Sequence, residues 1–164
     1  MSWIFKIAAT IIIVLGHVAL SGSSNPILSS INLPIAFLVL SIRLFDFPFK
    51  LAFALLAGFI LDVYSNLPFG SFMITFFLIS ISLDVLFYNF FTDRSLYSIL
   101  VLSLIGITIY NFSFILILSG SYLLGFSDFL VNQNYIWNYL LQLLVNGLVI
   151  AIGFYLSNRL LKFK

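Results

Sequence analysis

The sequence predicts an all-α fold: a polytopic membrane protein with six transmembrane helices in one compact bundle and with the N and C termini in the cytoplasm. The first observation is composition, since 63% of the 164 residues are hydrophobic and only 7% are charged, against about 25% charged residues in an ordinary soluble domain. With a mean hydropathy of +1.22, the chain has too little polar surface to cover a globule of this size in water. The second observation is the spacing of the apolar runs, and the third is the position of the basic residues.

Six apolar runs divide the chain into candidate spans of about 20 residues, the length that an α-helix needs to cross the hydrocarbon core. They cover residues 3–20, 27–43, 50–66, 71–91, 96–119 and 137–158. These spans account for nearly the whole chain. Residues 1–164 are therefore expected to form a single integral membrane domain, with no room for a soluble catalytic or receptor domain.

Every Lys and Arg residue falls on one side of this six-span pattern. The seven positions are Lys6, Arg43, Lys50, Arg94, Arg159, Lys162 and Lys164, whereas the connections 21–26, 67–70 and 120–136 contain none. Positive charge in short loops marks the cytoplasmic face, because such loops resist translocation. Both ends of the chain are therefore predicted to be cytoplasmic.

The residue inventory excludes several classes of function. There is no Cys, no Glu and a single His, so disulfides, thiolate catalysis, iron–sulfur sites and His-rich metal motifs are excluded. No serine lies in a Gly-x-Ser-x-Gly elbow, and no glycine-rich loop could cradle a phosphate. A net charge of +2 is too small for a basic stripe that binds nucleic acid. We therefore expect a non-enzymatic protein with no cofactor, no metal and no nucleic-acid partner.

The first span could be mistaken for a cleaved signal peptide, because Lys6 precedes an apolar run that ends in small residues. We favour an uncleaved first helix, since polytopic proteins often begin in this way; cleavage would leave five spans with the same topology. His17 lies alone among apolar residues of this span. A lone histidine there is more often an interhelical hydrogen-bond partner than a metal ligand.

The second span, 27–43, is unusual because Ser29, Ser30 and Asn32 precede Pro34, and proline suits the first turn of a helix better than its middle. A helix that begins at Pro34 and ends at Phe45 would be about 18 Å long, too short for a hydrocarbon core of about 30 Å. Two alternatives remain open. The helix could continue to Phe47, or residues 27–33 could enter as non-helical chain buried against protein.

The third span carries Ala54, Gly58 and Asp62 at four-residue spacing, so the three residues share one helix face. Small residues on such a face let a neighbouring helix approach closely, and a buried carboxylate normally has a partner. Asp62 could serve binding or proton relay, or it could end the span by bonding loop backbone or water, the interpretation that we favour. Pro68 and Gly70 predict a tight outer turn before the fourth span.

The fourth span carries Asp84, with Ser80 and Tyr88 one turn away on either side. Asp84 is expected to face the bundle interior and to accept a hydrogen bond from one of these hydroxyls. In antiparallel helices Asp62 would lie about 6 Å from the outer turn and Asp84 about 21 Å from it. This offset in depth is too large for shared acid–base chemistry or for one metal ion.

The fifth span is expected to begin near Ser95, where Thr92 or Asp93 could cap the helix. It contains Asn111, which is expected to be buried. The connection 120–136 that follows is predicted to be an outer loop or a short interfacial helix with aromatic residues at headgroup level.

The sixth span repeats polar and small residues at helical spacing: Tyr139, Gln142, Asn146 and Gly153, with Gly147 beside them. The simplest interpretation is that these residues bond helix six to its neighbours, each bond contributing about 0.6 kcal/mol. The alternative is a face that lines a substrate site.

Several of these segments together resemble the MreD family of rod-shape-determining membrane proteins. The resemblance is carried by the run Ala57-Gly58-Phe59-Ile60-Leu61-Asp62 with Pro68-Phe69-Gly70 after it, by Asn32-Leu33-Pro34 before an apolar helix, and by Val145-Asn146-Gly147 before a basic tail. The length and the six-span layout are also similar. The connection 43–50 is less basic than the family pattern, and the first span is similar in hydropathy only.

The resemblance implies a non-enzymatic scaffold of the cell-wall elongation machinery in the bacterial cytoplasmic (inner) membrane. It implies binding to the bitopic membrane protein MreC. It also implies association with the MreB filament and with the glycan polymerase and transpeptidase of the elongation complex. Helix packing or partner contact is expected at Ala54, Gly58, Asp62, Gly70, Asn146 and Gly147.

The main alternative is the substrate-binding membrane subunit of a small-molecule, vitamin-type uptake transporter, because MreD-like folds are similar to such six-helix components. A transporter subunit would keep a polar pocket of about 300 Å³ or more, which Asp84, Asn111, Gln142 and Asn146 could line. A scaffold would instead fill its interior with apolar side chains and contact its partner on the lipid-facing or outer surface. An intramembrane enzyme is the least favoured class, because the residues for catalysis are missing.

Overall fold

The computed structural model describes residues 3–91, 95–123, 125 and 134–161, and these residues form helices and connections without a β-strand. The helices are α1 (Trp3–Ser21), α2 (Pro26–Ser29), α3 (Leu33–Ser41), α4 (Phe47–Tyr64), α5 (Ser71–Phe90), α6 (Leu96–Leu123) and α7 (Tyr135–Leu161). The prediction of an all-helical fold is confirmed for this part of the chain.

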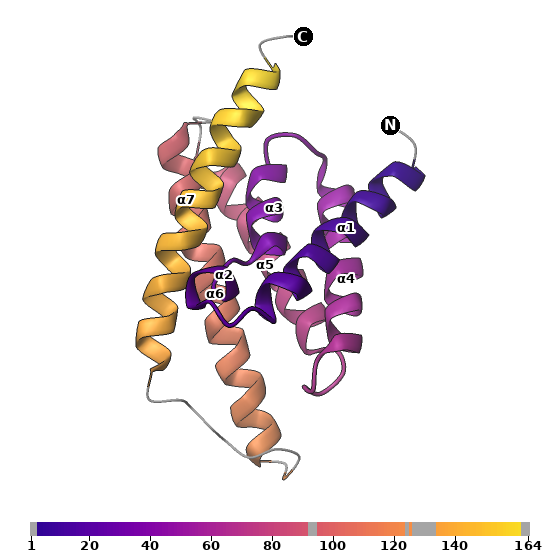
Figure 1. Ribbon diagram of the computed structural model, residues 1–164. Helices are drawn as coiled ribbons and strands as arrows, with labels where there is room; N and C mark the ends of the chain where they lie inside the picture. Colours follow the sequence, from indigo (N-terminus) through magenta and orange to yellow (C-terminus); the bar gives the residue numbers. More distant parts are fainter. Residues whose placement is uncertain (1–2, 92–94, 124, 126–133, 162–164) are drawn as a thin grey trace.

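The long helices pack in chain order, α4 against α5, α5 against α6 and α6 against α7. Figure 1 shows α1 across α4 on one side of the bundle, and α6 with α7 on the other. This arrangement follows from the short connections, because a six-residue connection such as 65–70 forces the helices that it joins to lie antiparallel and adjacent.

The centre of the bundle is α3, which contacts α1, α4, α5, α6 and α7. Its side chains Ile35 and Val39 are fully buried and belong to one apolar core with residues of the surrounding helices. A helix of nine residues is about 13 Å long and cannot span a membrane alone. Its burial inside protein explains why such a short helix is tolerated at membrane depth.

Residues 27–43, predicted as one span, do not form one continuous helix. The chain forms the short α2, leaves helical geometry at residues 30–32, and starts again as α3. Each start is encoded locally, since the Asn25 side chain caps α2 and the Asn32 side chain caps α3, with a proline in the first turn of each helix. Of the two alternatives, the entry of residues 27–33 as non-helical chain is correct only for residues 30–32. A helix that continues to Phe47 is wrong, because α3 ends at Ser41.

Four helices are long and apolar enough to cross a membrane: α4, α5, α6 and residues 135–159 of α7. The chain is therefore a membrane protein with at least these candidate spans among its described residues. In α1, the stretch Lys6–Ser21 is apolar but shorter. Helix α6 extends four residues beyond the predicted end at 119, and α7 begins two residues before the predicted start at 137.

The charge pattern agrees with the arrangement of the helix ends. Figure 1 shows that α1 begins, α7 ends and α3 connects to α4 at one end of the bundle, whereas the α4–α5 turn lies at the other. Lys6, Arg43 and Arg159 therefore lie toward the same end. That this end is cytoplasmic stays a prediction from the charge bias. The predicted cap at Thr92 or Asp93 lies outside the described residues.

Candidate functional site

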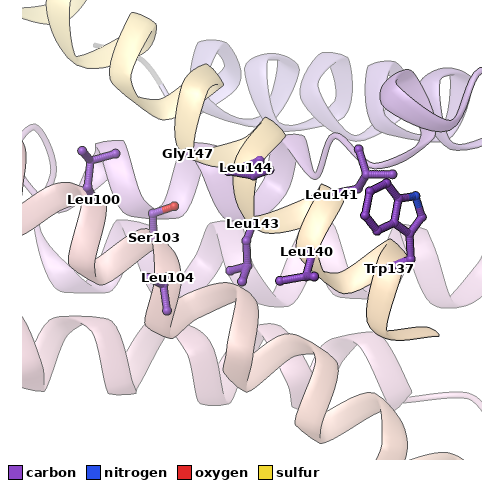
Figure 2. A pocket seen from close by; sticks show the side chains of 9 residues that line it. All are labelled: Leu100, Ser103, Leu104, Trp137, Leu140, Leu141, Leu143, Leu144 and Gly147. Carbon is purple, nitrogen blue, oxygen red and sulfur yellow. The ribbon is translucent and has the colours of Figure 1, made fainter. Parts of the chain in front are cut away.

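An apolar groove of about 500 Å³ lies between α6 and α7. Figure 2 shows Ser103 and two leucines of α6 on one side and a row of α7 side chains on the other. The α7 row ends at Trp137, which is 64% exposed, and at Gly147. A Cβ atom added at Gly147 would have no neighbouring atom within 4 Å, so this glycine leaves open space along the groove and does not serve close packing inside the protein.

At Gly58 the backbones of α4 and α5 approach each other closely. A Cβ atom added to Gly58 would lie 2.5 Å from the Met73 Cα and 2.7 Å from the Met73 backbone nitrogen. Ala54, one turn earlier on the same face, is fully buried. The absence of a side chain at Gly58 is therefore required for this helix pair, because backbone atoms cannot rotate out of the way.

The carboxylate of Asp62 binds the first turn of the neighbouring helix. Its Oδ1 accepts a hydrogen bond from the Phe72 backbone N–H at 2.9 Å and its Oδ2 accepts one from the Met73 N–H at 3.1 Å. These N–H groups have no partner inside α5, and a negative charge at a helix N-terminus is favourable. Gly70 enters this turn with φ of 95°, a left-handed conformation that glycine adopts without strain. Asp62 therefore ends α4 and starts α5.

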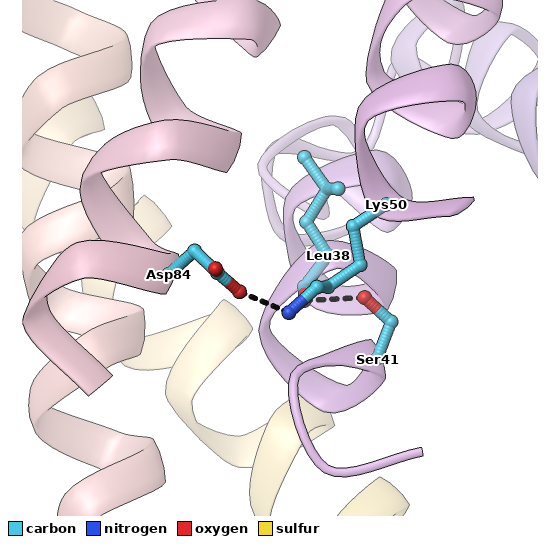
Figure 3. Close-up of polar contacts among 4 residues, drawn as sticks. All are labelled: Leu38, Ser41, Lys50 and Asp84. Atoms are coloured by element: carbon cyan, nitrogen blue, oxygen red, sulfur yellow. Dashed lines mark hydrogen bonds and ion pairs between the residues drawn. The ribbon is translucent and has the colours of Figure 1, made fainter. Parts of the chain in front are cut away.

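Asp84 is paired with Lys50, a residue that the sequence pattern placed at the inner end of the third span, beside the connection that begins at Arg43. Figure 3 shows Lys50 of α4 reaching across to Asp84 of α5, with Leu38 and Ser41 of α3 beside the pair. The side chains are 2% and 14% exposed, so both charges are removed from solvent. The ring of Tyr88 lies 5.7 Å from the Lys50 ammonium. The hydroxyl of Ser80, one of the two predicted donors to Asp84, has no hydrogen-bond partner, so Ser80 is not a donor to Asp84.

The two aspartates lie apart, as the depth calculation predicts. Asp62 binds the α5 backbone at Phe72, and Asp84 lies twelve residues further along α5, about 18 Å at the rise of an α-helix. Among the described residues no three His, Cys, Asp or Glu side chains gather in a way that could hold a metal ion.

Asn146 restores the backbone hydrogen bonds that are lost where α2 and α3 separate. Its Oδ1 accepts from the Asn32 backbone N–H at 2.7 Å, and its Nδ2 donates to the Ser30 carbonyl at 2.9 Å. From the other side, the His17 Nδ1 donates to the Ile31 carbonyl oxygen at 3.1 Å. Asn146 is fully buried. These contacts explain how a non-helical segment is satisfied inside the bundle.

A second polar network joins the middle of α6 to the N-terminal half of α7. The Asn111 Nδ2 donates to the Gln142 Oε1 at 2.7 Å, and the Tyr135 hydroxyl donates to the Asn111 Oδ1 at 3.1 Å. Tyr139 and Thr108 share a hydrogen bond of 2.9 Å between their hydroxyls. This network matches the interpretation that polar residues of the last span hold it to its neighbours.

Two small polar pockets lie beside these networks, at the end of the bundle that carries the α4–α5 turn. One has a volume of about 210 Å³ and the other about 250 Å³. Gln142 lines both pockets, Asn111 lines only the smaller one, and neither Asp84 nor Asn146 lines either. Taken separately, each pocket is below the size of about 300 Å³ that is usual for a small-molecule site, but the two adjoin each other at Ser29 and Gln142, which line both.

Sequence reasoning missed two features, the Lys50–Asp84 pair and the groove that Gly147 opens. The first had a signal, because Lys50 lies about 24 Å from the outer turn at 1.5 Å per residue, close to the depth calculated for Asp84. The second had none, since the open side of a glycine in an apolar helix depends on where the neighbouring helices lie.

Comparison of the chain with protein-family models, with curated proteins and with solved structures found no match.

Proposed function

We propose that this protein is a non-enzymatic membrane scaffold of the bacterial cell-wall elongation machinery, in the cytoplasmic membrane. In this proposal it binds an MreC-like bitopic protein. Through that protein it associates with the MreB filament, the glycan polymerase and the transpeptidase. The resemblance of the sequence to the MreD family names these partners. The structure supports the coarser part of the proposal, which is a helical membrane protein whose buried polar residues hold its own helices together.

The placement of the buried polar groups supports a scaffold over an enzyme. Asp62 is bound to the start of α5, Asp84 to Lys50, and Asn146 to the chain break. Each of these groups, which sequence reasoning identified as candidates for chemistry, is engaged in an internal contact. None is left aimed at a cavity that could hold a reacting group.

The observation that carries the proposal is the apolar groove along α7, the least buried of the four candidate spans. Only 17% of the apolar stretch of α7 is buried inside the protein, against 33–44% of the corresponding stretches of α4, α5 and α6. Close approach at small residues is the main source of association between helices in a bilayer, where apolar burial alone gives little. A groove opened by Gly147 therefore fits the single transmembrane helix of a bitopic partner.

A matched pair of glycine variants tests this assignment. Gly147→Leu fills the groove, whereas Gly120→Leu adds the same side chain to α6 at a site with no atom within 4 Å. We expect both variants to fold, and Gly147→Leu to reduce co-purification of the MreC-like partner at least about tenfold, a loss typical of a blocked central contact. Co-purification is measured from membranes that contain both proteins. Equal partner recovery with Gly147→Leu and the unmodified protein would refute the groove as the partner site.

A second function, the substrate-binding subunit of an uptake transporter, is favoured by one observation: the polar pockets that Gln142 lines. Against it, two of the four predicted lining residues, Asp84 and Asn146, lie in internal contacts elsewhere. Uptake of a vitamin that depends on this protein would favour the transporter.

A further inference from the structure

The two small polar pockets are neighbouring lobes of one recess. Ser29 of α2 and Gln142 of α7 line both of them. Helix α2, only four residues long and without a buried residue, carries Ser29 between the lobes. The recess is therefore bounded on one side by the least anchored helix of the protein.

The recess lies toward the end of the bundle that the charge pattern predicts to be external. Its lining residues come from the ends of helices: Ser21 from the end of α1, Tyr64 from the end of α4, Phe72 from the start of α5, and Tyr135 from the start of α7. A molecule that enters the recess would arrive from the side opposite the beginning of α1.

The chemistry of the lining is polar and uncharged. Among the residues that the structure describes, no Lys, Arg, Asp or Glu lines either lobe. The polar lining consists of hydroxyl, amide and tyrosine side chains with the single imidazole of His17. An ion placed among such groups would lose hydration without gaining a counter-charge, which is costly near a bilayer. A molecule with several neutral donors and acceptors would lose little.

Two amide groups at the recess have capacity left for a ligand. The Gln142 Oε1 accepts from Asn111, but no described residue accepts a hydrogen bond from the Gln142 Nε2. Asn138 lines the smaller lobe and is exposed. Each lobe also has a tyrosine ring, which presents both an apolar face and a hydroxyl: Tyr139 lines the smaller lobe and Tyr110 the larger one.

We propose that this recess is a binding site for a neutral, hydroxyl-rich small molecule such as a sugar, with Gln142 as the residue that contacts it in both lobes. The inference goes beyond the proposed scaffold function and does not depend on it. The apolar groove that is proposed for the partner shares none of its lining residues with the recess.

Saturation-transfer NMR on the protein in zwitterionic lipid nanodiscs, without sugar-based detergent, tests the site. The neutral probes are glucose and N-acetylglucosamine. The charged probes are glucuronate, which adds a carboxylate to the same ring, and glucosamine, which adds a primary amine. We expect saturable binding of at least one neutral probe and binding at least about tenfold weaker for both charged probes, because one charged group without a partner costs this much or more.

Two variants locate the binding. Gln142→Leu should weaken it about tenfold through the loss of an amide that bonds the ligand. Ser29→Phe, at an exposed position of α2, should block both lobes without disturbing the core. Ser119→Phe, outside the recess, is the matched control and should bind as the unmodified protein does.

Failure of both neutral probes to bind saturably would overturn the proposal. So would equal binding of the charged probes, or unchanged binding in Ser29→Phe. Melting temperatures of the variants in the same nanodiscs show whether each has folded. Partner co-purification is a separate measurement, so loss of the ligand site and loss of the scaffold function are distinguishable.

Discussion

Gly58→Leu is expected to destabilise the protein by about 3 kcal/mol or more, the upper end of the cost of overpacking. The added Cβ alone would lie 2.5–2.9 Å from backbone atoms of Phe72 and Met73. Only a separation of α4 from α5 can relieve this overlap. Such a separation would also pull the Asp62 carboxylate away from the two N–H groups that it binds.

Gly147→Leu is the matched control, because the same substitution there meets open space. The melting temperature of each variant, measured in one detergent, should fall strongly for Gly58→Leu and stay near the unmodified value for Gly147→Leu. Equal melting temperatures for both variants would contradict the close packing of α4 on α5.

Lys50→Met is expected to cost about 3–5 kcal/mol, because it leaves the Asp84 carboxylate buried without its counter-charge. Asp84→Leu should have an effect of similar size, for the converse reason. The two residues face each other between α4 and α5, and the Lys50 side chain is almost wholly buried.

The double variant Lys50→Met with Asp84→Leu separates a structural role of the pair from a functional one. Replacing both partners of a buried pair by apolar residues is often neutral or stabilising, so the double variant should recover most of the stability lost in each single variant. A double-mutant cycle on unfolding free energies measures this coupling. Additive losses in the double variant would show that the ion pair is not the interaction that matters at these positions.

The hairpin of α4 and α5 was predictable from sequence because its signals are local. Four-residue spacing places Ala54, Gly58 and Asp62 on one face, and the short turn that ends at Gly70 allows only one neighbour for that face. What sequence could not give is the bond between the Asp62 carboxylate and the start of α5, since it depends on the depth at which the two helices meet.

In the predicted second span, residues 27–43, local signals marked where a helix begins but not how far it extends. Asn32 and Pro34 predict a helix start, and the structure has one. The end of α3 at Ser41 had no comparable signal. The chain break is stable because Asn146, 114 residues away from Asn32, supplies the missing hydrogen bonds, and contacts over such a separation cannot be read from helical periodicity.

The charged residues illustrate a different difficulty. Lys50 was placed at the inner end of the third span and counted among the residues that mark the cytoplasmic face, because basic residues near span ends usually do so. The structure places it in the first turn of α4, buried against Asp84. The depth calculation for the α4–α5 hairpin was applied only to the two aspartates. Had Lys50 been included, its calculated depth would have paired it with Asp84.

Depletion of the gene in a rod-shaped bacterium that encodes this protein tests the scaffold function most directly. The account predicts that cells lose their rod shape and that the MreC-like partner no longer localises to the sites of wall growth, while vitamin uptake is unchanged. Cells that keep their rod shape after depletion, or that lose vitamin uptake while their shape is normal, would contradict it.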